Sequence, residues 1–156
     1  FDRDLRMTRK AVLESSSSER FEKGITALLF LLGLTPVLLL ETDSPDIIVA
    51  TPGGRLVIVE CTTRMADFNS KLGKLVDRRG SLSKILQASR HYFRVDAALV
   101  CALPKDQIAI REDDLVTHQV ILITKEELVE AFNQLRFPND PDKMIDNAIA
   151  KLAAGA

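Results

Sequence analysis

Three short β-favouring segments stand between two long helical segments, and this order limits the possible folds more than any other feature. Apolar side chains recur at helical spacing over residues 17–33 and again over residues 67–93. Between these helices, turn residues separate the segments 37–41, 46–51 and 55–63. Such short connections join neighbouring antiparallel strands, because a parallel crossover needs a dozen or more residues. The sequence predicts a helix, three antiparallel strands and a second helix.

The second half of the chain adds strands and helices to this core. A nearly continuous apolar run at 95–103 predicts a strand buried on both faces, and residues 119–124 predict another strand. Helices are expected at 125–136, after Thr124 as N-cap, and at 141–154. The fold class is therefore α/β: a three-layer α/β sandwich around a mixed sheet, with the core order α-β-β-β-α-β.

The length of 156 residues suits one domain with a sizeable core. Apolar residues make up 46% of the chain and charged residues 28%, which excludes a disordered or collagen-like chain. We expect a single α/β domain at 15–156. Residues 1–14 have no strong apolar face, and we expect them to be a linker or a loosely attached helix. Because the chain begins with Phe1, we also expect further domains in a longer parent chain.

Two features bear on the cellular setting. The most apolar stretch, residues 25–40, is interrupted by Gly33 and Pro36 and is shorter than the ~18 residues that suggest a membrane span. Cys61 and Cys101 lie in β-branched apolar runs, where buried free thiols are the usual finding. We therefore expect no membrane segment and a cytoplasmic protein.

The net charge of −1 conceals an uneven distribution. Residues 62–94 hold eight basic and two acidic side chains, which is a local charge of +6, whereas the segments before and after carry −2 and −5. A basic middle segment in an otherwise acidic chain indicates a local contact with a polyanion. The alternative is a solvated helix face that happens to be basic.

Two carboxylates are expected to face each other on the second hairpin. A three-residue loop, Pro52-Gly53-Gly54, suits an αR conformation at Pro52 and a left-handed conformation at Gly54. Paired positions then sum to 106, so that Asp46 lies opposite Glu60 on the same face. Like charges directly opposite each other destabilise a sheet, which indicates a cation or a shared proton between them. A two-residue Gly53-Gly54 turn would instead put the two acids on opposite faces.

Carboxylate oxygens at this spacing suit Mg²⁺ or Mn²⁺, which bind one or two carboxylates together with water and phosphate oxygens. Strand alternation places Leu56, Ile58, Glu60 and Thr62 on one face and turns Cys61 to the other. The Cys61 thiol is therefore expected to pack rather than to act as a nucleophile.

The segment Ser44-Pro45-Asp46-Ile47-Ile48, followed by Leu56-Val57-Ile58-Val59-Glu60-Cys61-Thr62, resembles the core of the PD-(D/E)XK nuclease superfamily. The upstream Phe21-Glu22-Lys23 resembles the first helix of Mrr-type members. The resemblance covers about residues 17–124 and implies the restriction-endonuclease-like fold. It further implies that Asp46, Glu60 and the backbone carbonyl of Cys61 hold a divalent metal, supported by Glu22.

One residue departs from this family pattern. The family's lysine, two residues after the glutamate, is Thr62 here, and threonine supplies no cation to orient water or to screen a phosphate. Some members take that group from the following helix, where Lys71, Lys74 and Arg78 are spaced i, i+3 and i+7. Lys74 is the preferred replacement and Lys71 the second choice.

These observations lead to one main hypothesis and to alternatives. The main hypothesis is a Mg²⁺-dependent nuclease domain that hydrolyses DNA phosphodiester bonds. It would be the catalytic part of a larger restriction or repair type protein. A homodimer is compatible with this hypothesis. The phosphate backbone would be held by Arg78, Arg79, Lys84 and Arg90. The alternatives are a catalytically degenerate nuclease-like domain that binds DNA or serves assembly, and a domain that binds a phosphorylated small molecule.

Overall fold

The structure is a computed structural model that describes residues 2–39, 44–64, 66, 68–109, 112–135 and 140–154. The helices are η1 (Arg3–Leu5), α1 (Arg6–Leu13), α2 (Ser18–Leu31), α3 (Phe68–Ala88), η3 (Lys105–Gln107), α4 (Glu112–His118), α5 (Lys125–Asn133) and α6 (Pro141–Ala154). The strands are β1 (Thr35–Leu38), β2 (Ile47–Ala50), β3 (Leu56–Thr62), β4 (Val95–Cys101) and β5 (Val120–Ile123). The first strand therefore begins earlier than predicted, and residues 40 and 41 of its predicted end lie outside the described residues.

The five strands form one mixed sheet in the order β1-β2-β3-β4-β5. The pairs β1–β2 and β2–β3 are antiparallel, whereas β3–β4 and β4–β5 are parallel. Pro36 lies in the edge strand β1, where a residue without an N–H is tolerated. The predicted mixed sheet and the predicted core order are both confirmed.

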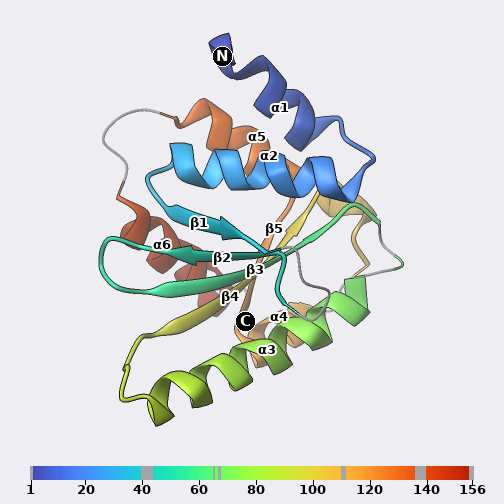
Figure 1. The fold of residues 1–156 in the computed structure, drawn as a ribbon. Helices are drawn as coiled ribbons and strands as arrows, with labels where there is room; N and C mark the ends of the chain where they lie inside the picture. The colour runs from blue at the N-terminus through green and yellow to red at the C-terminus, as the bar shows by residue number, and fades with distance from the viewer. Residues whose placement is uncertain are drawn as a thin grey trace.

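Helices cover both faces of the sheet and make the molecule three layers thick (Figure 1). On one face, α1, α2, α5 and α6 pack around a cluster that includes Phe21, Ile25 and Leu28, each of which is at most 1% exposed. On the other face, α3 and α4 cover a smaller cluster that contains Leu75 and Leu99. The sheet therefore presents one face to each cluster.

The helix α4 was not predicted from the sequence. It lies between β4 and β5, which run parallel, and a parallel connection has to cross from one end of the sheet to the other. Leu115 of α4 is buried in the cluster beneath α3. Four of the seven residues of α4 are charged or histidine, which hides its short apolar face in the sequence.

The long helix α3 is continuous, although it contains Gly73 and Gly80, a residue type that weakens a helix interior. A Cβ atom at either glycine would meet no heavy atom within 4 Å. Both glycines therefore face open space, and the packing of Leu72 and Leu75 against the sheet holds the helix together.

The turn between β2 and β3 fixes the register on which the site depends. Thr51 and Arg55 close the loop, since the Thr51 N–H donates to the Arg55 carbonyl at 2.9 Å, and Gly54 has the left-handed φ of +79°. Ile47 pairs with Val59 and Ile48 with Ile58, so the predicted sum of 106 is confirmed.

Asp142, in the first turn of α6, holds this turn in place. Its carboxylate accepts hydrogen bonds from the Thr51 hydroxyl at 2.6 Å and from the Gly53 N–H at 2.8 Å. These bonds lower the pKa of Asp142 below its usual value. The C-terminal helix therefore supports the hairpin that carries the two acids.

The N-terminal segment is a packed helix rather than a loosely attached one. Val12 of α1 is only 1% exposed and joins the cluster above the sheet, and the Arg9 guanidinium lies 5.0 Å from the centre of the Phe132 ring. The expectation of loose attachment was wrong. This helix is short and carries few apolar side chains, all on one face, so its packed face is hard to recognise in the sequence.

The contact between α1 and α2 leads to a prediction about Gly24. A Cβ atom at Gly24 would lie 2.9 Å from both Ala11 Cβ and Val12 Cγ2, so Gly24→Ala must push the two helices apart. We expect this variant to lose about 1 to 3 kcal/mol of stability in denaturant unfolding. Gly80→Ala is the matched control, because it adds the same methyl group in open space and should gain up to about 1 kcal/mol. Equal effects of the two changes would contradict the close packing of α1.

Among the described residues, no helix is long and apolar enough to span a membrane. Cys61 and Cys101 are both buried free thiols, as predicted.

Candidate active site

Three oxygen atoms from the ends of β2 and β3 converge on a single cation, the ammonium of Lys71. The Lys71 Nζ atom lies 2.9 Å from Asp46 Oδ2, 2.5 Å from the Cys61 carbonyl oxygen and 3.5 Å from Glu60 Oε2. These are the three groups that the family resemblance implies as metal ligands. The structure therefore brings them together, around the side chain of a lysine.

Backbone pairing positions the two acids. Asp46 directly precedes β2, and its carbonyl still accepts a hydrogen bond from the Leu39 N–H at 3.0 Å. Its carboxylate reaches across the hairpin and accepts the Cys61 N–H at 2.7 Å. Asp46 is thus held against the end of β3, beside Glu60, by bonds that follow directly from the register.

Glu60 is a buried acid between two cations. It is 2% exposed, and its two carboxylate oxygens contact different partners: Oε1 accepts a hydrogen bond from Arg78 Nη1, and Oε2 faces Lys71. Arg78 is itself largely buried, with 19% of its side chain exposed. Its guanidinium therefore balances the charge of a buried carboxylate.

Burial and the charge of Asp46 raise the pKa of Glu60 more than Lys71 and Arg78 lower it. For Lys71, burial disfavours the ammonium, but the hydrogen bond to Asp46 and the charges of both acids outweigh it and raise its pKa. Lys71 therefore stays charged at neutral pH, and the site holds a fixed positive charge.

The raised pKa of Glu60 predicts a pH dependence of stability for the metal-free protein. The folded state binds the Glu60 proton more tightly than the unfolded state, so stability should fall as pH rises from about 4.5 through the raised value. Glu60→Gln should flatten this slope in denaturant titrations at several pH values. A residual slope of the same sign is expected from Glu22, whose pKa is also raised. An unchanged slope in Glu60→Gln would contradict the assignment.

Glu22 on α2 faces the same site. Burial is the main cause that raises its pKa, and the next is the charge of Asp46. Glu60 raises it further and Lys71 lowers it, so the four charges interact. Its predicted supporting place is consistent with these interactions.

Cys61 and Thr62 contribute differently. The Cys61 thiol is 1% exposed in the cluster on the far face of the sheet, and burial raises its pKa well above the usual value. Only the carbonyl of Cys61 faces the site. The Thr62 hydroxyl donates to the Arg64 carbonyl at 2.9 Å and accepts the Arg64 N–H at 3.3 Å, which shapes the turn after β3.

The basic side chains of α3 divide between the site, other contacts and solvent. Lys71 and Arg78 turn toward the carboxylates, whereas Lys74, the preferred replacement for the family's lysine, is exposed. Arg79 donates to the backbone carbonyls of His118 and Gln119 at the end of α4. Lys84 lies near the C-terminus of α3 and Arg90 lies just beyond it, and both side chains are exposed.

The donor set fits a hard divalent cation. Two carboxylates and a carbonyl are oxygen ligands of the kind that Mg²⁺ and Mn²⁺ prefer, and they already surround one positive charge. The part of the chain that the structure describes contains no cluster of three or more His, Cys, Asp or Glu side chains suited to a metal. A metal here would therefore depend on the Cys61 carbonyl as the third protein ligand.

No family model and no curated protein matches the sequence. Solved structures do match. The small subunit R.BspD6I2 of the heterodimeric restriction endonuclease R.BspD6I is similar with a TM-score of 0.68 and 14% identity, over 97% of this chain and 90% of that one. The chain therefore has the restriction-endonuclease-like fold. Restriction endonuclease FokI is also similar, with a TM-score of 0.58 and 12% identity, over 81% of this chain and 26% of FokI.

The restriction-endonuclease-like fold explains the geometry of the hairpin. The order of helix, three antiparallel strands, helix and parallel strand, which the resemblance implied, runs here from α2 to β4. Asp46 directly precedes β2 and Glu60 lies in β3, so the hairpin brings these two acids to one end of the sheet.

Proposed function

We propose that this chain is a metal-dependent deoxyribonuclease domain that hydrolyses DNA phosphodiester bonds with Mg²⁺ or Mn²⁺. The observation that carries the proposal is the convergence of Asp46 Oδ2, Glu60 Oε2 and the Cys61 carbonyl on one positive charge. Two acids of a β-hairpin face each other at a cost, and a cation between them offsets that cost.

Asp46, Glu60 and the Cys61 carbonyl would hold the metal, and Glu22 would support them from α2. When bound, the metal would polarise the phosphate and lower the pKa of a water molecule. Lys71 competes for the same oxygens, and its long side chain can turn toward a phosphate that enters the site. In that position it supplies the positive charge that Thr62 lacks.

The exposed basic residues Lys74 and Lys84 extend along α3 from this site and would contact the phosphate backbone without reading sequence, as would Arg90. Arg78 and Arg79 are less suited to this role, because their guanidinium groups contact Glu60 and the end of α4.

The test combines metal binding with cleavage. Asp46→Ala and Glu60→Gln should each abolish Mn²⁺ binding in calorimetry and Mg²⁺-dependent nicking of plasmid DNA, because too few anionic oxygens remain for a small hard cation. Glu19→Ala is the matched control, since the Glu19 side chain is 75% exposed on α2 and pairs only locally with Lys23. Undiminished Mn²⁺ binding in both site variants would overturn the proposal.

A catalytically degenerate domain is the second candidate, and one observation favours it. Lys71 already satisfies the converging oxygens, and Thr62 takes the place of the family's lysine. Wild-type protein that binds DNA, but cleaves neither plasmid nor single-stranded DNA with any divalent metal, would establish this candidate.

The setting of the domain follows as part of the same proposal. Two buried free thiols suit the reducing cytoplasm. R.BspD6I2, to which this chain is similar, is one subunit of a heterodimer. A homodimer, or a complex with a further subunit, would therefore suit this domain.

A further inference from the structure

An exposed aromatic loop, residues 90–93, follows α3, and its rings have no part in the carboxylate site described above. Tyr92 is 84% exposed, the highest value among the large apolar side chains in the described part of the chain, and Phe93 is 46% exposed. The His91 and Phe93 rings stack with their centres 6.0 Å apart and their planes at 26°. The Phe93 ring also approaches Gly54, to 3.9 Å from the position of a Cβ atom there, which supports the loop on the hairpin turn.

The backbone of this loop holds an arginine where glycine is favoured. The His91 N–H donates to the Leu86 carbonyl at 2.8 Å and the Arg90 N–H to the Gln87 carbonyl at 3.0 Å, which is the Schellman pattern of a helix end. The residue in the left-handed position is Arg90, with φ of +59°. A side chain there costs stability that glycine would not, so its presence indicates a use for the guanidinium.

Exposed basic side chains adjoin the aromatic loop. No acidic residue occurs between Asp77 and Asp96, and that interval contains five lysines and arginines. Lys84 and Arg90 are exposed, whereas Arg94 is paired with Asp96 at 3.1 Å. The surface around Tyr92 therefore favours an anionic partner.

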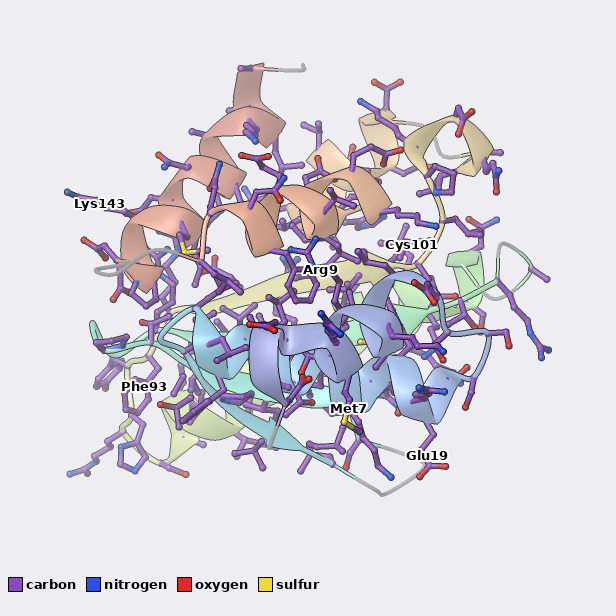
Figure 2. The ribbon with its side chains drawn as sticks, turned by 90° about the horizontal axis from the view of Figure 1, so that it is seen from above. Met7, Arg9, Glu19, Phe93, Cys101 and Lys143 are labelled. Atoms are coloured by element: carbon purple, nitrogen blue, oxygen red, sulfur yellow. The ribbon has the colours of Figure 1, made fainter. Side chains whose placement is uncertain are left out.

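The loop and the site lie at opposite ends of the sheet. Lys71 is near the start of α3 and Arg90 just beyond its end, which separates them by about 28 Å at 1.5 Å per residue. Figure 2 shows Phe93 at one side of the molecule and Cys101, at the end of β4 that neighbours Thr62, toward the other. Binding of a ligand at the loop can therefore be measured independently of the carboxylate site.

We propose that the loop at 90–93 binds single-stranded nucleic acid, with Tyr92 stacking on an unpaired base and Arg90 and Lys84 contacting phosphates. An exposed ring flanked by cations is the arrangement that binds single strands without regard to sequence. A duplex offers this ring no base face, because its bases stack on one another. The inference rests on the proposed function only in taking nucleic acid as the partner, and it adds a contact remote from the site.

The test is fluorescence anisotropy with a labelled oligothymidine of about 20 nucleotides, long enough for the usual site sizes, in EDTA so that no cleavage occurs. Tyr92→Ala should weaken binding about 5- to 150-fold, the usual loss for one stacked base, and Tyr92→Phe should retain it. Arg90→Gly should lower the slope of log affinity against log salt by about 0.7 and at the same time raise the melting temperature.

Two controls separate the outcomes. Met7→Ala removes an apolar side chain that is 70% exposed on α1 and should leave oligothymidine binding unchanged. Because the assay is run in EDTA, without the metal that the nuclease proposal requires, the loop contact stands even where that proposal fails. Full binding by Tyr92→Ala would overturn the inference, and so would an equal loss of binding by this variant for a duplex of the same length.

Discussion

Lys71→Met should bind Mn²⁺ more tightly than the wild type and, at the same time, cleave DNA roughly 10²- to 10⁴-fold more slowly, the usual loss for a positioned acid–base group. The gain in affinity should be about tenfold or more, because the variant lacks a unit charge that lies on the ligand oxygens. Calorimetry measures the first effect, and initial rates at saturating Mn²⁺ measure the second. Opposite changes in binding and rate would show that one lysine both occupies the site and serves catalysis.

Lys74→Met is the matched control for this prediction. It removes the same side chain three residues along α3, where the lysine is exposed, and should leave Mn²⁺ affinity unchanged. Thr62→Lys, combined with Lys71→Met, should partly restore the rate, because it returns a cation to the usual strand position. A Lys71→Met variant with wild-type Mn²⁺ affinity would contradict competition for the oxygens, and wild-type cleavage would exclude Lys71 from the chemistry.

The sequence predicted the hairpin that carries the acids, and the structure decides for the three-residue loop over the two-residue turn. Gly54 adopts the left-handed conformation that a three-residue loop requires, and this loop length sets every pair between β2 and β3. Because side chains alternate along a strand, the same register decides that Glu60 faces α3 and that the Cys61 thiol faces the opposite cluster. Local turn chemistry thus determined the placement of Asp46 opposite Glu60.

The choice between Lys71 and Lys74 depended on a property that the sequence does not determine. The buried Leu72 and Leu75 set the rotation of α3 on the sheet. At about 100° per residue, Lys71 lies about 70° from the midpoint of these leucines and Lys74 about 130°. A stripe of three cations was predicted to face one way, but this difference in angle is enough to turn one lysine toward the acids and the other to solvent.

The contact of Arg78 also depends on the rotation of α3 and was therefore not predicted from the sequence. It lies about 90° from the midpoint of the two leucines, at the edge of the buried face, and was predicted to bind DNA. Its guanidinium instead contacts Glu60. Basic residues near a predicted carboxylate pair are therefore candidates for charge compensation first, since a buried acid needs a partner more than a solvated phosphate does.

Arg78→Met should destabilise the metal-free protein by about 2 to 4 kcal/mol in denaturant unfolding at pH 8, one of the largest effects expected of a partly exposed residue. The change leaves Glu60, which is 2% exposed, with Lys71 at 3.5 Å as a counter-charge, and a buried carboxylate with weaker compensation is costly. The loss should shrink toward pH 5, because the raised pKa of Glu60 rises further without the arginine and proton uptake then removes the charge.

The double variant Glu60→Gln, Arg78→Met separates charge compensation from packing. The amide keeps the shape of Glu60 without its charge, so the double variant should recover about 1 to 3 kcal/mol relative to Arg78→Met, the range of coupling for residues in contact. Glu60→Gln alone should be about as stable as the wild type at pH 8, since burial already disfavours the ionised acid. If Arg78→Met instead kept full stability and lost DNA binding, the guanidinium would act on the phosphate backbone and Glu60 would not require it. If the two changes added independently, the loss would come from the packing of the arginine stem along α3, and the Glu60 contact would contribute nothing to stability.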